Sequence, residues 1–500
     1  MIVANSFKLT NYLPLALMRQ LAVVRPPADA HGLPSIRGTI SNCTGFSHNR
    51  CSFSPSFFRP QKKISIDQLA RWYANPMAAT VIRADRTRTI RTETTFSTAV
   101  AMLALVMLQL WSVSSAYAQA GTCAGMSVGQ LSSLNGFVPF AASSLWNTDI
   151  SAAPVDPNSA NLINYIGAAV TVHPDFGSGT WAGQSIGIPY QIVAGTQVEA
   201  TIQLMAYGDE SDPGPMPVPS KALIEGYPKP GNGDRHVLVL EKDGCWLYEL
   251  YNAHRVNGKK WKADSTAVWD MTIDEQRPYS WTSADGAGLP IFLGLARYDE
   301  VAAGAINHAL RFTVPVTQQA FVAPASHWAS SVTDPNAPPM GTRLRLKASF
   351  DISGFSAPNQ VILTALKKYG MILADNGSAI YISGAPDSRW SNDDLGNLKT
   401  LIGSDFEFVQ MGTIYSNSNP PPTGSAPSIN SFSPAQASIK HGQSTLLNWN
   451  VTGSNYNLIS GIGPVRGGSI QVSPKKTTSY TLDATNQYGR AAGVATVVVK

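Results

Sequence analysis

The stretch DRHVLVLEKDGCWLYELYNAH (residues 234–254) has the pattern of a β-hairpin. Apolar and other residues alternate on both sides of the dipeptide Asp243-Gly244. Asp-Gly between two alternating runs favours a two-residue type I′ connection, which fixes the residues that lie opposite each other. The expected cross-strand pairs are Leu240 with Leu247, Leu238 with Glu249, and His236 with Tyr251.

One face of this hairpin therefore combines an imidazole, a carboxylate and a phenol, from His236, Glu249 and Tyr251. These groups can supply a general base, a carboxylate that orients it and a proton donor. They can equally form a hydrogen-bonded polar network on a partly covered sheet face. We predict the three residues as candidate catalytic groups that share one wall of an accessible hollow.

The composition is that of a folded chain rich in turns. Five hundred residues favour two or three domains, and 44% hydrophobic with 14% charged residues describes globular protein. The 41 glycines and 34 prolines favour β structure joined by loops over helical bundles.

Charge is unevenly distributed along the chain. Residues 1–118 contain 13 Lys+Arg and 4 Asp+Glu, whereas residues 119–424 contain 18 Lys+Arg and 27 Asp+Glu. The large middle segment is thus acidic, although the whole chain has a formal net charge of +5. General attraction to nucleic acid is therefore not expected.

Residues 94–118 are predicted to be a secretory signal peptide. Four arginines between residues 83 and 91 precede the apolar run AVAMLALVMLQLWSV, and the small-x-small site Ala116-Tyr117-Ala118 follows it. The run is shorter than the ~20 residues that a spanning helix needs, so no stable membrane span is expected after cleavage. The product is predicted to be secreted, periplasmic or on the cell surface.

Residues 1–93 are expected to be a poorly structured or misassigned extension. Met77 or Met102 can be the true start, and a genuine long leader is the alternative. After cleavage, two cysteines remain, Cys123 and Cys245. Export permits one disulfide between them, and a buried free Cys245 is the alternative.

The segment SNSNPPPTGSAPS, which begins at residue 416, has the composition of a stiff linker. We predict a main β-rich domain at residues 119–415, a linker at 416–426 and a small module at 427–500. The module contains short alternating runs bounded by Gly, Pro or Asn, which predict an antiparallel sandwich of roughly seven strands.

Residues 427–500 contain the runs PSINSFSPAQASIKHGQSTLLNWNV and VSPKKTTSYTLDATNQYGRAAGVATVVV. They resemble the immunoglobulin-like modules of secreted bacterial proteins, in which Trp449 would be the core tryptophan and Tyr480 would lie in a late strand. The cysteine pair of antibody domains is absent. The resemblance implies a spacer or adhesive role for this module and no chemistry.

The main domain is predicted to be a β-sandwich or jelly-roll-like fold with one or two helices. Expected strands lie in QVEATIQLMAY, HALRFTVPV, TRLRLKASFDI and the pair GMILADN/AIYISG, and the expected helix lies in PNQVILTALKKYG. Residues 119–415 are similar to uncharacterised exported bacterial proteins that carry a run like YGDESDPGPMPVP. That resemblance implies no particular activity.

Three carboxylates are crowded in that run, from Asp209, Glu210 and Asp212, and prolines stiffen the loop. A solvated acidic loop, a rigid cleft wall and a calcium site are the alternatives for it. We predict Asp209, Glu210 and Asp212 as candidate catalytic acids. We expect that the protein requires no cofactor, and we assign no residues as metal ligands. Calcium is an optional cation. The spacing is not that of an EF-hand.

Alternation in TRLRLKASF (residues 342–350) places Arg343, Arg345 and Lys347 on one strand face. These cations can neutralise buried carboxylates or contact an anionic ligand such as a uronate chain. We predict the second role. A basic strand with a histidine and a tyrosine nearby is loosely similar to the jelly-roll lyases that cleave acidic polysaccharides.

Loop tryptophans offer flat apolar faces for sugar rings, although tryptophan more often fills the ends of a sandwich. Trp281 and Trp328 are the predicted sugar contacts. Eight of the eleven tryptophans lie in the main domain: Trp146, Trp181, Trp246, Trp261, Trp269, Trp281, Trp328 and Trp390.

The sequence contains no Gly-x-Ser-x-Gly elbow, His-Glu-x-x-His motif, phosphate loop or dinucleotide fingerprint. Glycoside hydrolysis remains, because it needs only two carboxylates at a suitable separation. We therefore expect an exported protein that binds and cleaves a polysaccharide, as a hydrolase or a lyase. The alternative is a non-catalytic adhesion protein that recognises a cell-surface glycan or a protein.

Overall fold

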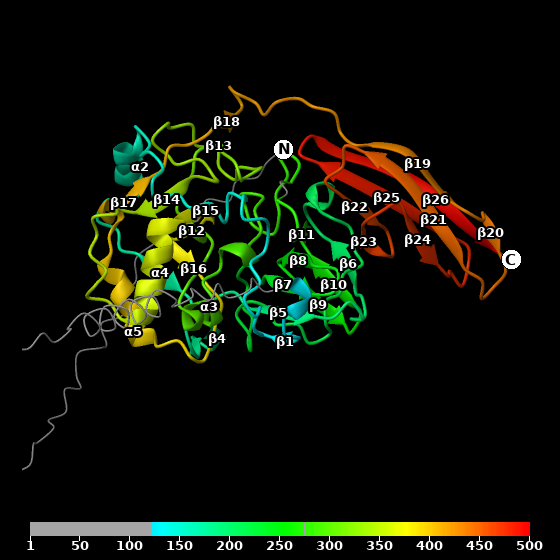
Figure 1. The fold of residues 1–500 in the computed structure, drawn as a ribbon, viewed down its shortest axis with the longest axis horizontal. Coiled ribbons are helices and arrows are strands. Elements are labelled where there is room, and N and C mark those ends of the chain that lie inside the picture. The colour runs from blue at the N-terminus through cyan, green and yellow to red at the C-terminus, as the bar shows by residue number, and fades with distance from the viewer. Residues whose placement is uncertain (1–121, 275–276) are drawn as a thin grey trace, which may run out of the picture. The chain divides into compact units, whose positions relative to one another are not determined.

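The computed structural model describes residues 122–274 and 277–500 (Figure 1). The predicted extension and signal peptide lie outside the described residues. The described chain is mostly β, which confirms the predicted fold class. Four α-helices are present in this part, more than the one or two expected: α2 (Ser159–Ile166), α3 (Tyr298–Ala303), α4 (Ala357–Lys368) and α5 (Asn392–Gly396). None of the helices in these residues has the length and apolar character to cross a bilayer.

The predicted hairpin forms the middle of a five-stranded sheet with the order β1-β5-β7-β8-β11. Its register is as predicted, with Leu238 opposite Glu249 and Leu240 opposite Leu247. The ring of His236, which precedes β7, lies 5.8 Å from the ring of Tyr251. The strands are β1 (Gly129–Gln130), β5 (Tyr190–Val193), β7 (Val237–Glu241), β8 (Trp246–Tyr251) and β11 (Ser265–Asp270).

The turn of the hairpin differs from the prediction. The last pair is Glu241 with Trp246, so the connection has four residues, 242–245, and not two. The Glu241 carboxylate accepts hydrogen bonds from the N–H groups of Asp243 and Gly244, at 2.6 and 2.8 Å, and thereby stabilises a wider loop. Cys245 has a φ of 62° and forms a disulfide with Cys123, with 5.6 Å between their Cα atoms.

Both faces of the hairpin are buried. Leu238, Leu240 and Leu247 pack in the main hydrophobic core, whereas Val237 and Val239 pack in a second cluster on the other face. Strands buried on both sides have near-continuous apolar sequences, and VLVL in β7 has this character. Polar residues that enter this sheet must therefore find partners inside the protein.

A second sheet has six strands in the order β17-β14-β15-β12-β16-β2. β12 pairs in parallel with β15 and lies between β15 and β16, so the runs GMILADN and AIYISG are not neighbours. The strands are β2 (His173–Asp175), β12 (Leu310–Val314), β14 (Arg343–Leu346), β15 (Met371–Asn376), β16 (Tyr381–Ser383) and β17 (Phe406–Phe408).

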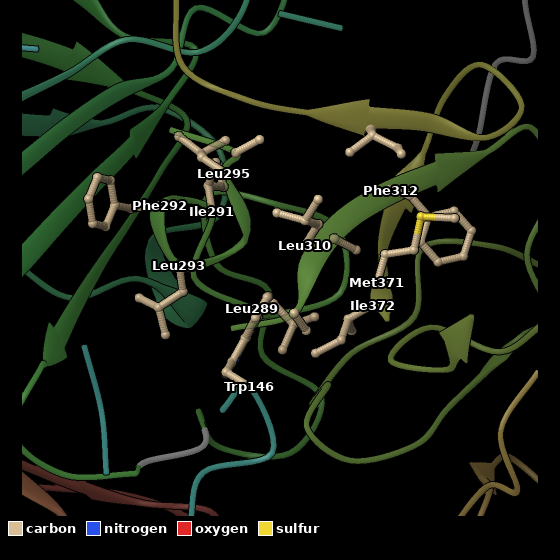
Figure 2. Packing of buried hydrophobic residues seen from close by; sticks show 14 of the residues in the cluster. Trp146, Leu289, Ile291, Phe292, Leu293, Leu295, Leu310, Phe312, Met371 and Ile372 are labelled. Carbon is tan, nitrogen blue, oxygen red and sulfur yellow. The ribbon is translucent and has the colours of Figure 1, made fainter. Parts of the chain in front are cut away.

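The main core contains side chains from β12, from β15 and from the segment at residues 289–295. Trp146, Leu289, Ile291, Phe312 and Met371 converge there (Figure 2). The predicted helix is α4, in which the Ser356 side chain caps the first turn and Pro358 lies near its start. Gly370, with a φ of 66°, follows its end as expected.

Smaller sheets and 3₁₀ turns complete the first part of the chain. One three-stranded sheet has the order β6-β10-β9. Its strands are β6 (Thr201–Leu204), β9 (His254–Asn257) and β10 (Lys260–Ala263). The two-stranded sheets are β3 (Thr180–Trp181) with β4 (Gln184–Ser185), and β13 (Ala320–Phe321) with β18 (Tyr415–Ser416). The 3₁₀ turns are η2 (Cys123–Gly125), η3 (Gly208–Glu210), η4 (Phe292–Gly294), η5 (Asn397–Thr400) and η6 (Gly403–Asp405).

Residues 427–500 form two sheets, with the orders β19-β21-β24 and β20-β26-β25-β22-β23. Eight strands are present where roughly seven were expected. Trp449 is buried in the core, as predicted, and Tyr480, which lies in a late strand as expected, is buried in the same core. The strands are β19 (Ser428–Pro434), β20 (Ser438–Ile439), β21 (Thr445–Thr452), β22 (Tyr456–Ile459), β23 (Gly463–Val465), β24 (Ser469–Val472), β25 (Thr478–Asn486) and β26 (Gly489–Val499).

Removal of the disulfide is expected to destabilise the fold, because the bridge joins residues separated by 122 positions. Closing so long a loop restricts the unfolded chain, and its loss should lower the free energy of unfolding by about 2–4 kcal/mol. Urea unfolding of oxidised protein and of the double variant Cys123→Ser/Cys245→Ser measures this difference. Reduced wild-type protein is the control and should match the variant, whereas equal midpoints for oxidised and reduced protein would contradict the expectation.

Candidate functional site

A pocket with a volume of about 830 Å³ lies in the main domain. β2 and β16 of the six-stranded sheet form one part of its wall, together with α5 and η5. The β3–β4 hairpin and the loop before β7 form the rest. Segments from distant parts of the sequence therefore meet at this pocket.

Three carboxylates line the pocket, from Asp175, Glu225 and Asp234. Asp175 ends β2, and the other two begin and end the loop that leads into β7. Arg235 fixes this loop, because its guanidinium donates hydrogen bonds to the carbonyls of Pro230, Gly231 and Ala253 at 2.8–3.2 Å.

His236 anchors Glu225 from behind the pocket. Its Nδ1 lies 2.7 Å from Glu225 Oε2 and its Nε2 lies 3.1 Å from the carbonyl oxygen of Ala284. Both ring nitrogens face acceptors, so both donate and the ring is an imidazolium ion. Burial opposes this charge, but the carboxylate of Glu225 raises the pKa of His236 to about 9. His236 is thus a fixed cation and not the general base that the sequence predicted.

The environments of Glu225 and Asp175 move their pKa values apart. Burial opposes ionisation of Glu225, but the charge and hydrogen bonds of His236 hold its pKa below the usual range. Asp175 is exposed to the pocket, and partial desolvation at the pocket wall, together with the negative charge of Glu225, raises its pKa. One carboxylate is therefore stabilised as a base and the other as an acid within the same pocket.

Aromatic groups lie beside these carboxylates. Trp181, on the β3–β4 hairpin, lines the pocket and is 80% exposed. The imidazole of His173 stacks on the ring of Tyr381, with 4.1 Å between centroids and 16° between planes. An exposed indole of this kind provides the flat apolar face on which a sugar ring stacks.

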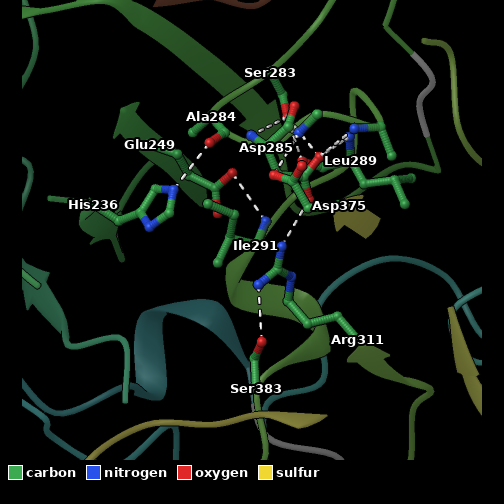
Figure 3. A network of polar contacts seen from close by, with 12 residues as sticks. His236, Glu249, Ser283, Ala284, Asp285, Leu289, Ile291, Arg311, Asp375 and Ser383 are labelled. Atoms are coloured by element: carbon green, nitrogen blue, oxygen red, sulfur yellow. Dashed lines mark hydrogen bonds and ion pairs between the residues drawn. The ribbon is translucent and has the colours of Figure 1, made fainter. Parts of the chain in front are cut away.

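The predicted role of Glu249 in an accessible wall is wrong. Its side chain is 0% exposed, and its oxygens accept bonds from the N–H groups of Ile291 and Phe292 and from the indole of Trp269 (Figure 3 shows the first of these contacts). The segment around residues 284–292 covers this sheet face, so Glu249 satisfies backbone groups in the core. Burial raises the pKa of its carboxyl.

A second set of charges, which does not line the pocket, is formed by Arg311, Asp285 and Asp375 (Figure 3). Arg311 donates to the Ser383 hydroxyl at 2.9 Å and lies 3.5 Å from an oxygen of the buried Asp285. Asp375 accepts a bond from the N–H of Gly286 at 2.9 Å. The positive charge of Arg311 lowers the pKa values of Asp175 and Glu225, although burial acts more strongly on both groups.

The other predicted catalytic residues lie outside this pocket. Tyr251 is half-buried beside His236. Asp212 forms a buried ion pair of 2.7 Å with Arg277 and accepts a bond from Val268 N, so it is a structural anion. Asp209 is exposed, whereas Glu210 accepts a bond from Thr282 N at 2.8 Å. The loop that carries them is therefore held by backbone contacts.

The basic strand is also not an open anion site. Arg343 donates to the carbonyl oxygen of Leu145, and burial lowers its pKa to about 10. Arg345 pairs with Glu407 at 2.5 Å, and Lys347 donates to Ser404 O at 2.7 Å. These cations satisfy internal acceptors, which was the alternative to ligand contact.

The predicted sugar contacts Trp281 and Trp328 do not line the pocket. Arg277 lies over the ring of Trp281 at 5.5 Å, and Trp328 stacks on Phe321 with 5.7 Å between centroids. Both side chains are half-buried and pack against protein groups. Trp181 occupies the exposed position that was expected of them.

One group of described residues has the spacing of a cation site. Ligand atoms of Glu225, Asp234 and His236 lie within 4.8 Å of one another. His236 would have to release a proton and its bond to Glu225 to bind a metal. The two carboxylates alone could contact a hard cation such as calcium, which stays an optional partner.

Sequence reasoning missed the main residues of the pocket: His173, Asp175, Trp181, Glu225, Asp234, Tyr381 and Lys399. Only the glycine-rich run GYPKPGNGD, between Glu225 and Arg235, signalled a loop with unusual backbone geometry. Local patterns do not indicate which distant strand meets such a loop.

Comparisons with known proteins identify no family. No family model matches the chain, and no curated protein matches it. Among solved structures, a chimeric titin Z1Z2 tandem functionalised with a GRGDS peptide of fibronectin is 14% identical, over 19% of this chain and 72% of the other, with a TM-score of 0.13. A likeness with this score carries no argument about fold or function.

Stability should decline in alkaline solution because of His236. Its pKa is about 9 in the folded chain and near 6.5 when unfolded, so the folded chain holds an extra proton between these values. Its contribution to the free energy of unfolding is therefore full below about pH 6.5 and is lost as pH rises to about 9, by up to roughly 3 kcal/mol.

Urea unfolding of His236→Gln across this pH range should show a weaker decline than wild-type protein. His441→Gln, which changes an exposed imidazole, should retain the wild-type decline. An undiminished decline in His236→Gln would show that another group is responsible.

Proposed function

We propose that this chain binds a polysaccharide in the pocket and hydrolyses a glycosidic bond there, with residues 427–500 as an immunoglobulin-like spacer. The observation that carries the proposal is the pair of carboxylates with pKa values moved in opposite directions beside an exposed tryptophan. Glycoside hydrolysis needs one protonated and one ionised carboxyl group, one on each side of the scissile bond.

Asp175 is assigned the role of general acid. Partial desolvation at the pocket wall and the charge of Glu225 raise the pKa of Asp175, so its carboxyl stays protonated at a higher pH than a free aspartic acid. Its proton goes to the glycosidic oxygen as the bond from that oxygen to the anomeric carbon breaks, and the released sugar leaves as an alcohol. The aspartate then takes a proton back from water.

Glu225 is assigned the role of base or nucleophile. Its Oε2 is held by His236, and its side chain is 26% exposed at the pocket wall. The ionised group either removes a proton from the attacking water or bonds to the anomeric carbon before water releases the sugar. His236 acts as a positioning residue that stabilises the anionic form of Glu225.

Two alternatives differ from this proposal in measurable ways. A lyase would release unsaturated uronates, which absorb in the ultraviolet, whereas hydrolysis releases reducing ends without this absorbance. A non-catalytic adhesion protein would bind a glycan without turnover. The pKa separation in the pocket supports hydrolysis, because simple adhesion gives no reason for an acid and a base at one place.

The variants Asp175→Asn and Glu225→Gln should lose turnover and keep binding. Each should lower kcat by about 10²–10⁴-fold, the usual contribution of a positioned acid or base. Reducing-end release across a glycan panel measures kcat, and calorimetry measures Kd. Asp393→Asn is the matched control, because Asp393 is exposed and does not line the pocket.

Turnover by both variants at the wild-type rate would exclude this acid pair. Glycan binding without turnover by wild-type protein would support the adhesion alternative.

The pH dependence of kcat/KM should be bell-shaped and acidic. The rate rises as pH increases through the lowered pKa of Glu225 and falls as pH increases through the raised pKa of Asp175. In His236→Gln the cation that holds down the pKa of Glu225 is lost, so the acidic limb should move to higher pH. His441→Gln should keep the wild-type profile, and an unmoved limb in His236→Gln would contradict the assigned role.

A further inference from the structure

One end of the pocket is positively charged. Lys399, in η5, is exposed at the pocket wall and forms no ion pair with a described residue. The pocket is also lined by the carboxylates of Asp175, Glu225 and Asp234 and by Arg235, whose guanidinium is held by backbone carbonyls. A ligand in this pocket therefore meets an ammonium group as well as carboxylates, and their placement can select the charge of the ligand.

His173 lies at the positive end. Its backbone N–H bonds to Ile380 O, and Tyr381 holds its ring by stacking, but neither ring nitrogen bonds to a described residue. Burial and the charge of Lys399 lower its pKa, so the ring is neutral at pH 7 and has one N–H to donate. Lys399 and His173 together offer an ammonium group and an N–H donor, which suit a carboxylate.

The geometry of β2 relates this end of the pocket to the acid. His173 and Asp175 are two residues apart on β2, so their side chains lie on the same face of the strand, about 6.6 Å apart along it. That separation is comparable to the length of one sugar unit. If Asp175 protonates the oxygen of a glycosidic linkage, a substituent that His173 binds therefore lies on the sugar next to that linkage.

We infer that the pocket takes an acidic polysaccharide and that His173 and Lys399 bind a carboxylate on the sugar next to the cleaved linkage. This inference rests on the function proposed above. The ligand class is a uronate-containing glycan, since a uronate carries one carboxylate on each ring.

The test compares oligosaccharides that differ only in their carboxylates. Hexamers of galacturonate and of mannuronate are matched with their carboxyl-reduced forms, and Kd and kcat/KM are measured with the full chain. Wild-type protein should prefer at least one acidic hexamer by 10-fold or more. Lys399→Met should reduce this preference to below 3-fold, and His173→Phe, which keeps the stacking on Tyr381, should weaken it.

Lys259→Met is the matched control, because Lys259 is exposed and lies outside the pocket. This substitution removes the same positive charge as Lys399→Met. Equal binding and cleavage of acidic and reduced hexamers would overturn the anion site and leave the hydrolase proposal intact. A preference that Lys399→Met leaves unchanged would also overturn it. Failure of wild-type protein to bind or cleave any hexamer or any glycan of the panel would reject both proposals. Thermal melts of each variant confirm that it is folded.

Discussion

The ion pair between His236 and Glu225 connects the sheet, the pocket and the buried charges of the main domain. His236 begins the central hairpin, Glu225 begins the pocket loop, and the Ala284 carbonyl belongs to the segment that covers the sheet. Each partner is costly to bury alone, because a desolvated charge without a counter-charge is unfavourable. The pair therefore requires all three segments to be in place together.

The same rule governs the other charges of this acidic domain. Asp212 meets Arg277, Asp285 meets Arg311, and Arg345 meets Glu407. These arginines serve internal carboxylates and carbonyls, which leaves few cations free for a ligand. Lys399 and the neutral His173 are distinctive in the pocket for that reason, since Lys399 forms no ion pair with a described residue and the ring nitrogens of His173, which stacks on Tyr381, form no hydrogen bond with one.

The structure also separates the two glutamates near His236. Glu249 is the residue that the hairpin register places on the same side as His236, and it is sealed beneath the segment around residues 284–292. Glu225 lies in a loop before the hairpin and reaches both the imidazole and the pocket. Proximity in a strand ladder identified His236, but the covering segment decided which carboxylate lines the pocket.

The sequence by itself determined what depends on neighbouring residues. Alternation predicted the pairing of Leu238 with Glu249, and helical spacing with a final glycine predicted α4. Both features follow from side-chain periodicity and backbone preferences, which act over a few residues. The core position of Trp449 was predicted from the resemblance of residues 427–500 to immunoglobulin-like modules.

Only the tertiary structure decided which segments cover the sheets and which meet at the pocket. Asp175 and Tyr381 line the same pocket because β2 pairs in parallel with β16, a strand about two hundred residues later in the chain, and the loop before β7 brings Glu225 to it. Burial and neighbouring charge then set the pKa values of both carboxyl groups. Desolvation and Coulomb interactions depend on distance in space and not on distance in sequence, so no local pattern could reveal them.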